Sequence, residues 1–124
     1  MANPIRLIGF APAAQAVALI ANTTLGPAHY GKVLTNRGAA GAITHTLPSP
    51  TGLNGVTIYH LGFANQNVIF KTATADTLVV LNDQAADSLA FQTTSQKIGS
   101  YGIFYCDGTN WYGLPIRGTG TVVT

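Results

Sequence analysis

Short runs of β-branched and aromatic residues follow one another from residue 42 to residue 116, and apolar and polar positions alternate within several of them. Ile43, His45 and Leu47 fall on one side of the first run, and the two threonines between them fall on the other. A period of two residues is typical of a β-strand with one face in a core. Together the runs predict seven strands, at residues 42–47, 56–63, 67–73, 77–81, 89–93, 98–106 and 110–116.

Turn signals separate these runs and support an all-β fold. Asn54-Gly55 and Asp107-Gly108 are dipeptides that tolerate positive φ. The second lies between two apolar runs, so we expect the tip of a hairpin near Asp107. Seven short strands in a chain of 124 residues predict a small single-domain β-barrel or jelly-roll-like sandwich.

The first 40 residues follow no single period. Residues 13–21 fit either two helical turns or a short strand, because a short apolar run is compatible with both. We predict an extended N-terminal arm with one short strand over residues 1–40, followed by a β domain over residues 41–124. An apolar arm needs another surface, and each side chain buried there stabilises docking by about 1.5–3 kcal/mol. The side chains expected to contact a sister subunit or another protein are Ile5, Leu7, Ile8, Phe10, Val17, Leu19 and Ile20.

The composition favours a chain that lies against partners. Charged residues make up 8% of it and glutamate is absent, whereas an ordinary soluble domain is about a quarter charged. The six basic residues are spread singly, so no basic cluster points to nucleic acid. Cys106 is the single cysteine, which excludes an intrachain disulfide and fits folding in a reducing cytoplasm.

The N-terminal stretch does not fit a membrane or secretory segment. Arg6 followed by apolar residues 7–21 imitates the start of a signal peptide, but Pro12 and Gln15 interrupt the stretch. It is also shorter than the roughly 20 residues that span a bilayer. We therefore expect no membrane contact.

Residues with catalytic chemistry are sparse. All four aspartates lie beside predicted turns, where Asp caps backbone amides. Ser100 lies in the sequence Ile-Gly-Ser-Tyr-Gly, which lacks the first glycine of a G-x-S-x-G nucleophile elbow. No G-x-x-x-x-G-K-[ST] phosphate loop occurs. We expect no enzymatic activity, no catalytic residues and no cofactor.

The histidines do not form a metal motif within one chain. His29, His45 and His60 are 16 and 15 residues apart, without the spacing that places two imidazoles on one side of a helix or strand. We expect no metal site within the chain. One alternative stays open, because a single histidine on a three-fold axis would supply three ligands.

Aromatic residues gather near the C-terminus. Such side chains pack in cores and interfaces or stack on sugar rings. We take Tyr105, Trp111 and Tyr112 as candidates for an aromatic contact at the surface.

The chain from Leu47 onward carries a resemblance. It reads LPSPTGLNGVTIYHLGFANQNVIFKTATADTLVV and then GSYGIFYCDGTNWYGL. An LP-x-x-x-G start, the NVIFKTA and DTLVVL strands and the final G-x-x-x-C-D-G-T-N-W hairpin resemble head decoration, or cement, proteins of tailed bacteriophages. Residues 1–40 take no part in this resemblance.

The resemblance implies a function without chemistry. It implies a homotrimer that is assembled in the host cytoplasm, binds the major capsid protein on the capsid exterior of the virion and stabilises the shell. Similar DG-x-x-W endings occur in phage tail fibres and spikes. The alternative is therefore a receptor-binding or tail-fibre knob module.

Overall fold

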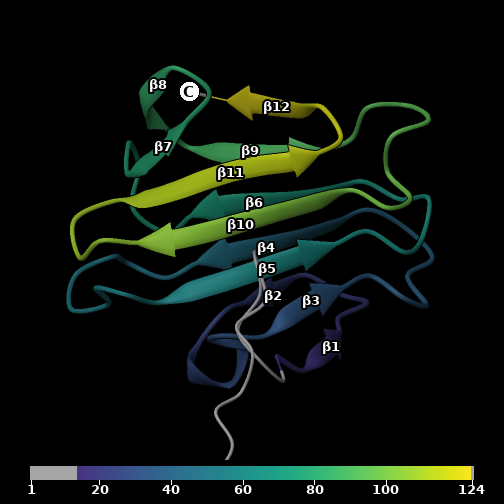
Figure 1. The fold of residues 1–124 in the computed structure, drawn as a ribbon, viewed down its shortest axis with the longest axis horizontal. Coiled ribbons are helices and arrows are strands. Elements are labelled where there is room, and N and C mark those ends of the chain that lie inside the picture. Colours follow the sequence, from purple (N-terminus) through teal and green to yellow (C-terminus); the bar gives the residue numbers. More distant parts are fainter. Residues whose placement is uncertain (1–13, 124) are drawn as a thin grey trace, which may run out of the picture.

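The strands form two sheets that pack face to face (Figure 1). The structure is a computed structural model and describes residues 14–123. Sheet A has the strand order β1-β3-β5-β10-β11-β7-β8, and sheet B has the order β12-β9-β6-β4-β2. The predicted all-β sandwich is confirmed. The strands are β1 (Ala16–Ala18), β2 (Thr23–Thr24), β3 (Val33–Thr35), β4 (Ile43–Leu47), β5 (Thr57–Leu61), β6 (Val68–Thr72), β7 (Leu78–Val80), β8 (Asp83–Ala86), β9 (Ser88–Phe91), β10 (Tyr101–Cys106), β11 (Trp111–Arg117) and β12 (Gly120–Val123), with one 3₁₀ turn at Pro27–His29.

A strand lies within each of the seven residue ranges predicted to form one. Ile43, His45 and Leu47 are buried while the threonines between them are half-buried, as the alternation predicted. β10 and β11 form the expected antiparallel hairpin, and the N–H of Asp107 at its tip donates to the carbonyl of Asn110 at 3.1 Å. The prediction missed the short strands β8 and β12, of which β12 pairs with β9 of the same chain. It also expected one short strand in residues 1–40, where the structure has β1, β2 and β3.

The first six strands alternate between the two sheets. β1, β3 and β5 are parallel neighbours in sheet A, and β2, β4 and β6 are parallel neighbours in sheet B. Parallel neighbours need a crossover between them, and here each crossover contains a strand of the opposite sheet. Residues 16–72 therefore wind around the core as a flattened coil, and β9, β10, β11 and β12 extend both sheets mainly by antiparallel pairs.

The described part of the predicted arm belongs to this coil. Residues 16–18 form a strand, which decides between the two alternatives left open for 13–21. Leu25 and Leu34 are 2% and 1% exposed and lie in the core. In residues 14–40 the predicted arm is thus part of the sandwich, because Leu25 and Leu34 lie in the core and Val17 and Leu19 pack against it. Residues 1–13 lie outside the described residues.

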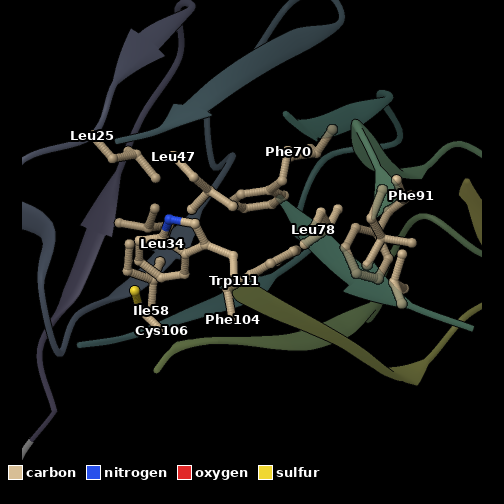
Figure 2. Packing of buried hydrophobic residues seen from close by; sticks show 14 residues of the cluster. Leu25, Leu34, Leu47, Ile58, Phe70, Leu78, Phe91, Phe104, Cys106 and Trp111 are labelled. Carbon is tan, nitrogen blue, oxygen red and sulfur yellow. The ribbon is translucent and has the colours of Figure 1, made fainter. Parts of the chain in front are cut away.

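The core between the sheets is aromatic at its centre. Phe70 of β6 stacks on Phe104 of β10 with ring centroids 4.3 Å apart, and Phe91 of β9 meets Phe70 edge-on at 6.4 Å. Trp111 is fully buried, and its indole N–H donates to the carbonyl of Pro48 at 2.8 Å. Figure 2 shows Leu34, Leu47 and Trp111 toward one end of the cluster and Phe91 toward the other. Trp111 thereby joins the C-terminal hairpin to the turn that follows β4.

Close packing of β10 against Phe91 requires a glycine. A Cβ added at Gly102 would lie 2.6 Å from the ring carbon Cζ of Phe91. Gly102→Ala should lower the free energy of unfolding by about 1–3 kcal/mol, the usual range for an overfilled core. Urea unfolding followed by tryptophan fluorescence measures the change.

Gly41→Ala is the matched control, because no atom lies within 4 Å of its added Cβ. It should leave stability unchanged or raise it by up to about 1 kcal/mol through the lower entropy of the unfolded chain. Equal unfolding midpoints for the two variants would contradict the packing described for Phe91.

Candidate functional site

The outer face of sheet A is apolar and aromatic, whereas a face toward solvent is ordinarily polar. Four of the five tyrosines of the chain lie on it. Leu114 is 47% exposed and Tyr105 is 39% exposed. We call this side of the sheet the tyrosine face. Its exposed or half-buried members are Leu61, Tyr101, Ile103, Tyr105, Tyr112 and Leu114, whereas Val33 and Tyr59 on the same side are buried, at 5% and 7% exposure.

Strand register explains why these side chains come together. Phe104 and Cys106 of β10 point into the core, so the residues that alternate with them point outward. Cross-strand pairs of this kind contact one another directly. The pairing places three rows across β5, β10 and β11, namely Thr57–Tyr105–Tyr112, Tyr59–Ile103–Leu114 and Leu61–Tyr101–Arg117. Arg117 is the one charged side chain in these rows.

The outer face of sheet B has a different chemistry. Its shallow hollow of about 280 Å³ is lined by Asn22, Lys71 and the threonines of β2 and β4. Small polar side chains of this kind are typical of a solvated sheet face. The contrast between the two faces makes the tyrosine face the candidate functional surface.

The tip of the β10–β11 hairpin holds one end of the tyrosine face in place. The hydroxyl of Tyr112 donates to Asp107 Oδ2 at 2.7 Å, and the N–H groups of Thr109 and Asn110 both donate to Asp107 Oδ1 at 2.8 Å. The Tyr112 hydroxyl and then the two amides lower the pKa of Asp107, and the same carboxylate raises the pKa of Tyr112. Asp107 therefore acts as a turn cap that orients Tyr112.

The structure separates the three aromatic residues proposed for surface contact. Tyr105 and Tyr112 are cross-strand neighbours on the tyrosine face. Trp111 is instead fully buried, because it precedes Tyr112 in β11 and so points to the opposite side of the sheet. Tyr59 was missed, and only the pairing of β5 with β10, which lie 40 residues apart, brings it to this face, whereas Tyr101 lies on the same side of β10 as Tyr105.

The apolar side chains of the arm that were predicted to contact a partner do not share one environment. Val17 and Leu19 pack against the core of their own chain. Ile20 is 64% exposed. The predictions for Ile5, Leu7, Ile8 and Phe10 lie outside the described residues.

A hollow of about 530 Å³ lies at the margin of the tyrosine face. β7 pairs with β11 at Leu78–Trp111 and Val79–Tyr112, whereas β11 continues to Arg117. The β7–β8 hairpin therefore leaves β11 partway along and opens a space beside it. Its lining residues are Val79, Val80, Leu81, Asn82, Asp83, Gln84, Tyr112, Gly113 and Leu114.

A serine and a histidine that are 40 residues apart in sequence meet inside the sandwich. His60 Nε2 lies 2.9 Å from Ser100 Oγ, and this hydroxyl donates its proton to the carbonyl of Lys97 at 2.8 Å. Because the single hydroxyl proton is committed to Lys97, His60 must donate its Nε2–H to Ser100. Both residues are 1% exposed. The pair is oriented opposite to a nucleophile and its general base, and it serves to hold β5 against the loop before β10.

Two histidines are buried in the neutral form. His45 and His60 pack edge-on against Phe70, with ring centroids 5.2 and 5.5 Å away. Burial, assisted by His29, lowers the pKa of His45 to about 4. Burial, assisted by His45, lowers the pKa of His60 to about 3. Since both rings lie between the sheets, neither can sit on a three-fold axis at the surface.

The remaining candidate reactive group, the thiol of Cys106, lies in the core. Cys106 is buried, and burial raises the pKa of its thiol, with Asp107 adding to the rise while the N–H of Gly108 opposes it. Among residues 14–123, no group of three or more His, Cys, Asp or Glu side chains could hold a metal ion. In the same part of the chain no helix is long and apolar enough to cross a membrane.

No known protein family, curated protein or solved structure matches this chain.

The buried histidines predict acid sensitivity. Their folded-state pKa values lie below the value near 6.5 of an unfolded histidine. The unfolded chain therefore binds protons first as the pH falls, and the free energy of unfolding should decrease from pH 6.5 toward pH 4 by about 1.4 kcal/mol per pH unit and histidine. Urea unfolding at several pH values measures this slope. A free energy that is constant between pH 7 and pH 5 would contradict the burial of neutral histidines.

Proposed function

We propose that this protein is a non-enzymatic structural module of a bacteriophage virion, which attaches to the outside of the capsid shell and stabilises it. The bacteriophage assignment comes from the resemblance of the chain after Leu47 to decoration proteins. The observation that supports the attachment is the junction at β1, where the apolar N-terminal sequence leads into a strand of the sandwich. The major capsid protein is the proposed partner.

β1 is held in the sandwich by backbone bonds and apolar contacts. β1 pairs in parallel with β3, and backbone bonds from Val33 to Gln15 and from Leu19 to Thr35, each 2.9 Å, extend the pairing beyond its ends. Val17 and Leu19 add apolar packing against the core. These bonds and apolar contacts join β1 to the sandwich, so a partner bound upstream of residue 14 would be linked to the sandwich through β1.

The segment upstream of β1 has the composition of an anchor. Ile5, Leu7, Ile8 and Phe10 lie within it, and Arg6 is its one charged residue. Each such side chain buried on a partner stabilises attachment by about 1.5–3 kcal/mol. In this proposal the segment binds the shell and the sandwich remains outside it.

Several linked copies would strengthen the attachment. Decoration proteins of the kind this chain resembles are homotrimers, and we propose the same state here. Linking binding sites raises overall avidity by about 10²- to 10⁴-fold over one site. Modest anchors would then hold against the outward pressure of packaged DNA.

A receptor-binding module of a fibre is the second candidate. It is favoured by a separate observation, the exposed Tyr105 and its neighbour Tyr112 on the tyrosine face. Aromatic side chains at a surface recognise sugars and proteins by stacking and burial.

Deletion of residues 2–13 tests the proposed anchor. The truncated protein should keep its unfolding midpoint, because Val17 and Leu19 remain in place. It should fail to bind particles that lack the native protein, as measured by co-sedimentation. Those particles should also rupture at lower temperature than particles loaded with the full chain.

Deletion of residues 2–21 is the contrasting variant. It removes β1 as well, so it should lower stability in addition to abolishing attachment. Full binding and full protection of particles by the chain without residues 2–13 would overturn the proposed anchor.

A further inference from the structure

The hollow beside the β7–β8 hairpin has two kinds of wall. Val79, Leu81, Leu114 and the aromatic Tyr112 are apolar members of the lining, and Asn82 and Gln84 are its members with amide side chains. Leu81 is 57% exposed and Leu114 is 47% exposed, so these walls are open to solvent. The volume of about 530 Å³ lies within the ~300–1,000 Å³ range of small-ligand sites.

This combination fits one class of ligand. A pyranose ring has apolar C–H faces that pack on aromatic and aliphatic side chains, and it has hydroxyls around its edge that pair with amides. We propose that the hollow is a carbohydrate-binding site, in which a sugar ring lies against Tyr112 and Leu114 and forms hydrogen bonds to Asn82 and Gln84.

The charge of the residues that line the hollow indicates which carbohydrates would bind. Asp83 is the one charged residue among the nine that line the hollow, and no lysine or arginine is among them. Asp83 Oδ1 accepts the N–H of Ala85 at 2.9 Å, and without a cation in the lining an anionic ligand would form no ion pair there. The site therefore takes neutral or N-acetylated sugars and excludes sialic acids and sugar phosphates.

The turn that forms the rim is held in an uncommon backbone conformation. Leu81 has φ of 45° and Asn82 has φ of 68°. Asparagine adopts this region readily, but a branched residue such as leucine does so at a cost. An exposed leucine at such a position contributes little to folding, which is consistent with a role in ligand contact.

Saturation-transfer NMR on the full chain tests the proposal directly. The probes are the methyl glycosides of glucose, galactose and N-acetylglucosamine, with N-acetylneuraminic acid as the anionic comparison. At the binding efficiency typical of small ligands, one sugar ring should reach about millimolar affinity. At least one neutral probe should show saturation transfer, and N-acetylneuraminic acid should show none.

Two variants and a control test whether the sugar binds in this hollow. Gln84→Ala removes one rim amide and should weaken binding by about three- to tenfold, the equivalent of one hydrogen bond. Gln92→Ala is the matched control, because Gln92 is an exposed glutamine after β9 that does not line the hollow. Leu81→Gly should weaken binding while leaving the melting temperature unchanged or raised, since glycine adopts positive φ without strain.

Three results would overturn the proposal. These are the absence of transfer to every neutral probe, equal affinity in all three variants, and preferred binding of N-acetylneuraminic acid. Attachment to capsids through residues 2–13 does not depend on this site, so either proposal can fail alone.

Discussion

The buried indole of Trp111 joins two parts of the molecule that differ in construction. Residues 16–72 wind as a parallel coil between the two sheets, and residues 78–123 complete both sheets mainly by antiparallel pairs. Trp111 packs among core side chains of both parts and donates to the carbonyl of Pro48, which is 63 residues away. Truncating a buried tryptophan to alanine costs about 3–5 kcal/mol, a large part of the ~5–15 kcal/mol that stabilises a typical domain.

The orientation of Trp111 determines which surface the chain presents. Because β11 alternates, an inward Trp111 requires an outward Tyr112, and the register with β10 then brings Tyr105 beside it. The Asp107 cap fixes the same hairpin at its tip. The tyrosine face and the hollow at its margin thus follow from how the core is packed, and the threonine-rich face of sheet B follows from the same alternation on the other side.

Local patterns predicted the strands well and the long-range arrangement poorly. The alternation at Ile43, His45 and Leu47 and the Asp107-Gly108 turn are properties of a few adjacent residues, so both were visible in the sequence. The burial of Trp111 was not, because an aromatic residue beside a turn has the same local pattern whether it points inward or outward. The contact of His60 with Ser100 depends on a pairing across 40 residues. The parallel coil likewise depends on which strands become neighbours. The local pattern of apolar and polar residues in each strand does not reveal its neighbours.

The β1 edge and the hollow lie at opposite ends of the strand order in sheet A. This separation allows one end to hold a shell while the other faces solvent. The most direct measurement of the proposed function is the position of the chain in an electron cryomicroscopy map of the intact virion. We expect the sandwich on the capsid exterior, with the β1 edge toward the major capsid protein and the β7–β8 hairpin away from it. Finding the chain on the tail, or on the capsid with the β1 edge facing solvent, would contradict the proposed attachment.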